Sequence, residues 1–207
     1  MKIAIIDYGV NNIFSIAGAI ESLGHVPQIV TNDQSTFNAD KIILPGVGAF
    51  KAGMKSLSNR GLINFLINKA TDGHDILGIC LGFQMLLTKS HEFGESSGLD
   101  LLDGEVKNIK TISGYNNEKI PNNGWRNLRI TNNNDPLFGP IKMDDYFYFI
   151  HSYYVDPADK SIITSKCIYD NIEIPASIQK NNIYGMQFHP EKSGKNGIEL
   201  LERFIEA

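Results

Sequence analysis

The chain has 207 residues, of which 42% are hydrophobic and 20% are charged, and its formal net charge is −4. A chain of this length buries about 70% of its unfolded surface on folding, so the composition excludes a disordered protein and a small disulfide-stapled module. The mild negative charge gives neither the basic footprint of a nucleic-acid-binding protein nor a polybasic membrane-binding stretch. We therefore expect no nucleic-acid partner and no membrane partner.

The two cysteines, Cys80 and Cys167, lie far apart in the sequence. No cysteine–histidine cluster has the spacing of a metal site, so we expect no metal, no cofactor and a reducing compartment. The first apolar run meets Asp7 too early for a signal segment or a membrane span. These features predict a cytoplasmic protein.

The N-terminal half alternates short apolar runs with helical periodicity. The continuous apolar run Ile3–Ile6 is typical of a strand that is covered on both faces. The helix after it is expected to begin near Asn12, as N-cap, and to stop at Gly24. Further strands are expected at residues 26–30, 41–44 and 76–80, and further helices at 50–57 and 62–70.

The second half is expected to contain mostly strands. Between Thr111 and Asp135 asparagine and glycine are dense, which indicates turns or excursions rather than helix. The later apolar runs are rich in β-branched and aromatic residues, which favours strands, some of them antiparallel. These strands are expected at residues 146–155, 162–169 and 183–188, before a closing helix at 198–205.

Strands that alternate with helices predict right-handed βαβ units and a mostly parallel sheet. The sequence contains no internal repeat and no linker long enough to separate domains. We therefore expect an α/β fold, built as a single three-layer domain over residues 1–207 around a mostly parallel, partly mixed central sheet.

The segment Gly78-Ile79-Cys80-Leu81-Gly82 has the glycine-x-nucleophile-x-glycine pattern of a nucleophile elbow. It follows a predicted strand and opens a predicted helix, so the turn lifts the thiol to a helix N-terminus, where the thiolate is favoured. The alternative is a core cysteine in a glycine-rich turn. The strand-turn-helix context favours the nucleophile, and Cys167 is interpreted as a core strand position.

A cysteine nucleophile needs a base that is held by an orienting partner. His189, at the end of a predicted strand, has Glu191 two residues later, and this carboxylate can fix one tautomer of the imidazole. His151 is the competing candidate, but its surroundings have strong strand character, so we interpret it either as structural or as a residue that supports the site without reacting. Of the other histidines, His25 and His74 are expected to be solvated.

An acyl-transfer reaction also needs hydrogen-bond donors for the oxyanion. The segment Pro45-Gly46-Val47-Gly48 closes a predicted parallel strand, at the edge where open α/β sheets bind their ligands. An ordinary strand-to-helix turn is the alternative interpretation. Beside the cysteine elbow, the functional interpretation is favoured.

Together, residues 45–50, 78–84 and 189–191 resemble the class I, triad-type glutamine amidotransferases. More narrowly, residues 43–50, 150–155 and 187–194 are similar to those of the glutaminase subunits of imidazole glycerol phosphate synthases. The resemblance runs nearly end to end, and its motifs occur in the family's order. It implies a flavodoxin-like fold.

The resemblance also implies a role for each matching residue. Cys80 would attack the side-chain amide of L-glutamine and form a γ-glutamyl thioester, His189 would move the protons, and Glu191 would orient His189. Substrate contacts would come from Gln84, Glu92, Ser152 and Tyr153, and backbone oxyanion donors from Gly46, Val47, Gly48 and Leu81.

A partner subunit is implied as well, because ammonia released to solvent would be lost. The family pairs the glutaminase with a cyclase subunit, expected to be a (β/α)8 barrel, in a heterodimer that makes imidazole glycerol phosphate and aminoimidazole carboxamide ribotide in histidine biosynthesis. We further expect weak glutaminase activity in the isolated chain, raised by the liganded partner. The flexible 46–48 turn motivates this expectation.

Two loops depart from the family pattern, at residues 8–13 and 121–126, and both are expected to face the partner. They leave open a related glutaminase subunit that supplies ammonia for amidation of a surface-polysaccharide sugar. A stand-alone cysteine hydrolase and a non-catalytic binding module on the same scaffold are the further alternatives. The residues Gln84 and Glu92 argue against the hydrolase, and the intact trio argues against the binding module.

Overall fold

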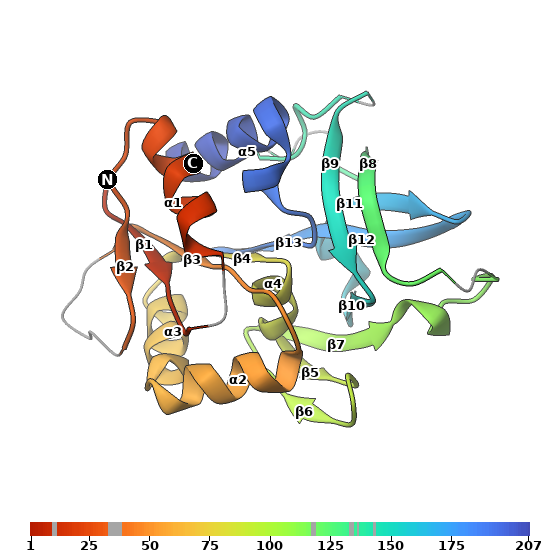
Figure 1. Ribbon diagram of the computed structural model, residues 1–207, viewed down its shortest axis with the longest axis horizontal. Coiled ribbons are helices and arrows are strands. Elements are labelled where there is room, and N and C mark those ends of the chain that lie inside the picture. The colour runs from red at the N-terminus through yellow and green to blue at the C-terminus, as the bar shows by residue number, and fades with distance from the viewer. Residues whose placement is uncertain (10–11, 33–38, 117–118, 133–134, 136, 143) are drawn as a thin grey trace.

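The computed structural model describes residues 1–9, 12–32, 39–116, 119–132, 135, 137–142 and 144–207 (Figure 1). Its central feature is a nine-stranded mixed sheet. The first five strands pair in parallel and the last four extend the sheet in antiparallel fashion. In sheet order the strands are β2 (Gln28–Val30), β1 (Ile3–Ile6), β3 (Lys41–Leu44), β4 (Asp75–Ile79), β13 (Ile183–Met186), β12 (Ile172–Lys180), β11 (Ile163–Tyr169), β8 (Asn122–Ile130) and β9 (Tyr146–His151).

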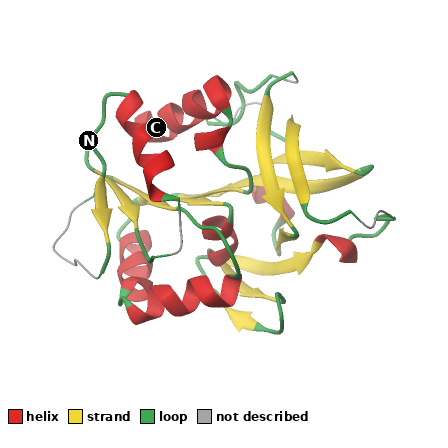
Figure 2. Ribbon diagram, viewed as in Figure 1, coloured by secondary structure: helices red, strands yellow, loops and turns green. Residues whose placement is uncertain are grey.

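Helices cover both faces of the parallel part of this sheet (Figures 1 and 2). On one face lie α1 (Ile13–Ser22) and α5 (Gly194–Glu206), and on the other lie α2 (Phe50–Asn59), α3 (Leu62–Thr71) and the short α4 (Leu81–Met85). The sequence of β1 is apolar throughout because its alternate residues enter the two opposite cores. The expected three-layer α/β fold with a mixed sheet is confirmed.

A second, four-stranded sheet lies beside α2 and α4 (Figure 1). The sequence predicted one continuous strand over residues 146–155, and this prediction is wrong. The chain leaves the large sheet at the end of β9, passes Ser152 and enters the second sheet as β10. The strands of this sheet, in order, are β10 (Tyr153–Pro157), β7 (Leu102–Asn108), β5 (Leu87–Ser90) and β6 (Ser96–Ser97).

Two further local predictions need correction. The asparagine-rich stretch after Thr111 contains a full strand, β8, which pairs with β9 on one side and β11 on the other. Backbone hydrogen bonds form this strand, and they do not depend on side-chain propensity. The side chain of Asn12 makes no capping hydrogen bond, whereas Gly24 does end α1, with φ of +83° just beyond the C-cap.

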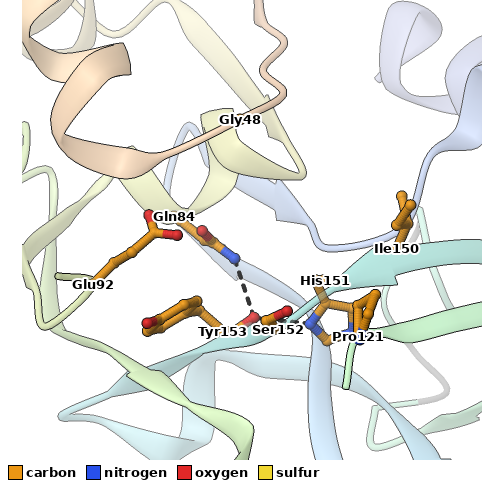
Figure 3. Close-up of a pocket in the computed structure, with 8 residues that line it drawn as sticks. All are labelled: Gly48, Gln84, Glu92, Pro121, Ile150, His151, Ser152 and Tyr153. Atoms are coloured by element: carbon orange, nitrogen blue, oxygen red, sulfur yellow. Dashed lines mark hydrogen bonds between the residues drawn. The ribbon is translucent and has the colours of Figure 1, made fainter. Parts of the chain in front are cut away.

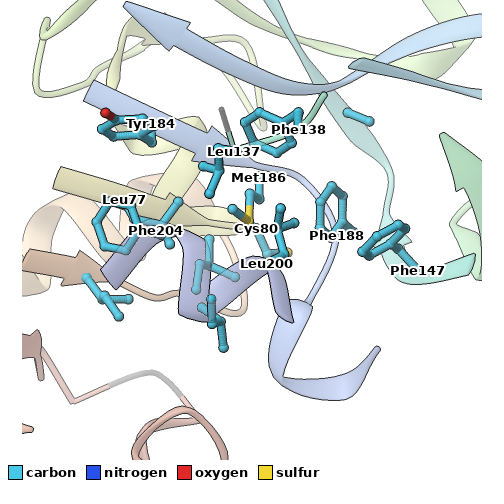
Figure 4. Close-up of a cluster of buried hydrophobic side chains, with 14 of the residues drawn as sticks. Leu77, Cys80, Leu137, Phe138, Phe147, Tyr184, Met186, Phe188, Leu200 and Phe204 are labelled. Carbon is cyan, nitrogen blue, oxygen red and sulfur yellow. The ribbon is translucent and has the colours of Figure 1, made fainter. Parts of the chain in front are cut away.

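The strand ends bring the predicted site residues to one edge of the sheet. Strands β4 and β13 pair in parallel, so Ile79 and Met186 lie side by side, and Cys80 follows directly. Figure 4 shows Cys80 among the apolar side chains of the cluster to which β4, β13 and α5 contribute. Among the described residues, no helix has the length and apolar character needed to cross a membrane.

Candidate active site

Cys80 occupies a strained turn between β4 and α4. Its φ of 54° lies in the left-handed region, which residues other than glycine rarely adopt, and such strain is concentrated at functional positions. The turn is also tight, because a Cβ atom on Gly82 would lie 1.8 Å from the carbonyl oxygen of Leu44. The structure therefore has the strand-turn-helix elbow that the sequence predicts.

The His189–Glu191 pair lies next to this cysteine, just past the end of β13. The backbone N–H of Cys80 donates to the carbonyl of Met186 at 2.7 Å, which ties the two strand ends together. The Nδ1 atom of His189 is 2.8 Å from Oε1 of Glu191, and both side chains are almost fully buried. Within the described part of the chain, the Nε2 atom of His189 has no hydrogen-bond partner.

The electrostatics of the site favour a charged imidazole. Burial by itself would lower the pKa of His189, but attraction to the Cys80 sulfur and the Glu191 carboxylate outweighs it and raises the pKa to about 10. A protonated imidazole donates Nδ1–H to Glu191 and keeps Nε2–H as a second donor. The pair can therefore stabilise a thiolate and hold a proton ready for transfer.

The 46–48 turn lies against the start of α4. The backbone N–H of Leu81 donates to the carbonyl oxygen of Gly46 at 3.3 Å. The buried hydroxyl of Tyr8 lies beside Gly46, where a Cβ atom would approach it to 2.4 Å, so this position requires glycine. Gly46 and Val47 line a small crevice with His189 and Glu191.

The predicted substrate contacts surround an open pocket of about 240 Å³ (Figure 3). Figure 3 shows Gln84 and Glu92 on one side, facing the backbone that passes from β9 to β10. Oε2 of Glu92 accepts a hydrogen bond of 2.6 Å from the N–H of Phe50, at the start of α2. The lining residues are Gly48, Gln84, Glu92, Pro121, Ile150, His151, Ser152 and Tyr153.

Cys80 lies next to this pocket, beside the backbone of Ile150. Its side chain is not among the lining residues, but its sulfur lies 4.0 Å from the carbonyl oxygen of Ile150, which does line the pocket. The structure thus brings together the nucleophile candidate, the His189–Glu191 pair and the residues predicted to contact substrate.

The family model of glutamine amidotransferase class-I matches residues 4–207. The chain belongs to this family.

Curated relatives agree with this assignment. The chain is 42% identical, over 99% of its length and 98% of the relative, to imidazole glycerol phosphate synthase subunit HisH 1 of Methanococcus maripaludis. It is 41% identical to subunit HisH of Moorella thermoacetica, over 99% of this chain and 94% of that protein. The family predicted from the motifs is confirmed.

Solved structures share the fold at low sequence identity. A structure of PurLQS from Thermotoga maritima superposes with a TM-score of 0.74 at 19% identity, covering 99% of this chain and 97% of that chain. A glutamine amidotransferase crystal structure superposes with a TM-score of 0.73 at 16% identity, covering 97% and 98%. These structures support the amidotransferase fold.

His151 lines the pocket of this amidotransferase and is held by hydrogen bonds on both ring nitrogens. Its Nδ1 atom is 2.8 Å from the carbonyl oxygen of Tyr153, and its Nε2 atom is 2.9 Å from Nδ2 of Asn122. Burial is the main cause that lowers the pKa of His151 to about 4, so the ring is neutral at pH 7.

Two side chains of the amidotransferase site were not predicted from the sequence. Asn122 is fully buried behind His151, and Gln187 is fully buried beside Cys80. The spacing of Gln187, two residues before His189, could have indicated the second, because alternate residues of an extended segment point to the same side. No sequence pattern indicated Asn122.

The expectation that the two divergent loops face a partner stays a prediction, and their side chains differ in exposure. Tyr8 and Asn122 are fully buried, and residues 10–11 lie outside the described part of the chain. Trp125, in contrast, is 49% exposed.

Other candidates have ordinary structural roles. Cys167 lies in β11 as predicted, and burial raises its pKa to about 12. His91 lies 3.2 Å from Glu105, and His25 and His74 are partly exposed. No group of metal-ligating side chains occurs among the described residues.

Proposed function

We propose that this class I amidotransferase is the glutaminase subunit of an imidazole glycerol phosphate synthase, which hydrolyses L-glutamine to L-glutamate and ammonia. The observation that carries the proposal is the position of Cys80, between the His189–Glu191 pair and the pocket that contains Glu92. The 42% identity to subunit HisH 1 of Methanococcus maripaludis supports the choice within the family.

The first half of the reaction forms a thioester. The Cys80 thiolate attacks the side-chain carbonyl carbon of glutamine, and the carbonyl oxygen becomes an oxyanion. When the tetrahedral intermediate collapses, the carbon–nitrogen bond breaks and His189 gives its Nε2 proton to the departing nitrogen. Ammonia leaves, and a γ-glutamyl thioester on Cys80 remains.

The second half hydrolyses this thioester. The neutral imidazole of His189 takes a proton from water, and the hydroxide so formed attacks the thioester carbon. The carbon–sulfur bond breaks, Cys80 returns to the thiolate, and glutamate is released. Glu191, 2.8 Å from Nδ1, holds the ring in place through both halves.

The pocket supplies partners for the charged ends of glutamine. The carboxylate of Glu92 is suited to the α-ammonium group, because charge-assisted hydrogen bonds are the strong ones. Ser152 and Tyr153 present backbone groups at the crossing from β9 to β10, and Gln84 faces them. The oxyanion would be held by backbone N–H groups of Leu81 and of Gly46, Val47 and Gly48.

The proposal includes a cyclase subunit, expected to be a (β/α)8 barrel, as partner in a cytoplasmic heterodimer. The cyclase subunit would use the ammonia to make imidazole glycerol phosphate and aminoimidazole carboxamide ribotide in histidine biosynthesis. Residues 1–207 of this chain would form one amidotransferase domain. Exposed apolar side chains near the site suit such a docking surface, and they are Val47, Trp125 and Ile150.

Replacement of Cys80 tests the proposal in the complex with a cyclase subunit. We expect Cys80→Ala to abolish glutamine-dependent cyclase turnover and to leave turnover with ammonium salts intact, as measured by product formation. Cys167→Ala, which removes the other cysteine, is the matched control and should keep both activities. Glutamine-dependent turnover in Cys80→Ala would overturn the proposal, and ammonia transfer only to a sugar-amidating partner would favour the alternative pathway.

A further inference from the structure

Gln187 contacts the nucleophile from the same segment that carries His189. The segment leaves β13 after Met186 and bends at residues 187–188 before it reaches His189. The Gln187 side chain is fully buried, and its Nε2 atom lies 3.8 Å from the sulfur of Cys80. The sulfur therefore has an amide group beside it as well as the imidazole.

The orientation of this amide is determined by a backbone carbonyl. The carbonyl oxygen of Tyr153 can only accept hydrogen bonds, so the amide of Gln84 must present its nitrogen to it, at 3.1 Å. The same nitrogen is 3.0 Å from Oε1 of Gln187. The oxygen of Gln187 thus faces Gln84, and its N–H group faces the sulfur.

The carbonyl of Tyr153 is itself held from the other side. Nδ1 of His151 lies 2.8 Å from this oxygen and must be the protonated ring nitrogen. The other ring nitrogen then accepts from Nδ2 of Asn122, at 2.9 Å. A continuous buried hydrogen-bond chain consequently runs from Asn122 to Gln187, and it ends at the sulfur.

We propose that Gln187 is a further catalytic residue, whose side-chain N–H donates to the Cys80 sulfur and stabilises its thiolate, and that Gln84 is the positioning residue that fixes this orientation. The proposal rests on the role of Cys80 as nucleophile. It adds a neutral donor, whose contribution is the same whatever the protonation state of His189.

The other groups around the Cys80 sulfur differ in whether they favour the thiol or the thiolate. The carbonyl of Ile150, 4.0 Å from the sulfur, can accept only from the protonated thiol, so it favours that form. The titratable groups that act on Cys80 are His189, backed by Glu191, and the buried phenol of Tyr8. Of these, only the imidazolium favours the thiolate, and Gln187 provides a second favourable contact.

The test compares Gln187→Met with the wild-type full chain, using alkylation of Cys80 by iodoacetamide as a function of pH. Methionine preserves the length of the side chain and removes the N–H donor. We expect the curve of alkylation rate against pH to move up by about one pH unit, with the same plateau at high pH. Cys167 does not interfere, because it is fully buried and its pKa is raised to about 12.

The matched control is Gln179→Met in β12, which pairs with Tyr184 at the far end of β13 from Cys80. It should alkylate like the wild type. A curve for Gln187→Met that superimposes on the wild-type curve, or that is lowered equally at every pH, would overturn the proposal. Thermal unfolding verifies that each variant is folded. If Gln187→Met does not fold, the same alkylation experiment is done with Gln187→Leu.

This readout is separate from the proposed function. Alkylation reports on the thiolate without glutamine or a cyclase subunit. A chain that shows the expected shift but produces no glutamate in the complex would contradict the glutaminase assignment and leave the role of Gln187 standing.

Discussion

The backbone N–H of Leu81 donates to the carbonyl oxygen of Gly46 across 3.3 Å. This contact joins the two segments that are expected to supply oxyanion donors. While it exists, the Leu81 N–H is occupied, and a carbonyl oxygen, itself partly negative, lies next to the region where the oxyanion would form. A rearrangement of the 46–48 turn is therefore needed before Leu81 can act as a donor.

The first prediction follows from this contact and concerns dependence on the partner. The isolated chain should hydrolyse glutamine slowly, and a cyclase subunit with bound ligand should raise the rate by about 10²–10³-fold, because one oxyanion donor is worth about that much. Steady-state glutamate production with and without the partner measures the effect. Equal rates in the two conditions would contradict the explanation.

The second prediction concerns the pocket carboxylate. In the wild type, Oε2 of Glu92 accepts from the N–H of Phe50 at 2.6 Å. Glu92→Gln keeps an oxygen that can accept this hydrogen bond, but it removes the negative charge that is suited to the substrate ammonium. We expect kcat/KM for glutamine to fall about 10–100-fold, mainly through KM, because a hydrogen bond to a charged group contributes about 1.5–3 kcal/mol. Glu95→Gln is the control, since Glu95 is exposed and paired with Lys89. A larger loss in the control would exclude this role.

The parts of the fold that the sequence predicted well are those where burial alone determines the pattern. The strands β1 and β3 have the predicted bounds, because apolar residues enter both cores. The strand β8 was missed, because asparagine and glycine gave it a turn-like composition although two neighbouring strands hold it. The division at Ser152 was missed as well, because both sides of it have the same strand composition.

The site shows the same division between local and distant information. Cys80, His189 and Glu191 were predictable from short motifs, since each motif contains its own chemistry. The chain from Asn122 to Gln187 was not, because it joins side chains from β8, β9, α4 and the end of β13 that only the folded sheet brings together. Long-range hydrogen bonds of this kind leave no local signature.

The third prediction is a loss of stability in acid that comes from His151. Its pKa is lowered to about 4 in the folded chain, while an ordinary histidine titrates near 6.5. The unfolded chain therefore binds the proton first, so this contribution is present above pH 6.5 and is lost as the pH falls toward 4. The free energy of unfolding should drop by about 2–3 kcal/mol between pH 7 and pH 4.5.

Urea unfolding at several pH values measures this slope. His151→Asn should flatten it, since asparagine can donate to the carbonyl of Tyr153 but does not titrate. His25→Asn is the control, because His25 is partly exposed in the turn after α1. The free energy of unfolding of this variant should depend on pH as it does in the wild type. His189 does not disturb the comparison, since its raised pKa makes its contribution fully present below pH 6.5. An unchanged slope in His151→Asn would exclude His151 as the cause.

The fourth prediction concerns Trp125 as an anchor for the cyclase subunit. Its indole is 49% exposed and meets the ring of Tyr148 edge-on at 6.0 Å, and that ring lies 6.4 Å from the imidazole of His189. Buried aromatic anchors contribute 2 kcal/mol or more to interfaces, so Trp125→Ala should weaken binding by about 30-fold or more in calorimetric titrations with the cyclase subunit. Ile168→Ala, which truncates a residue that is 46% exposed on β11, should bind like the wild type. If the two variants bind equally, Trp125 lies outside the interface, and the partner must approach the site from another side.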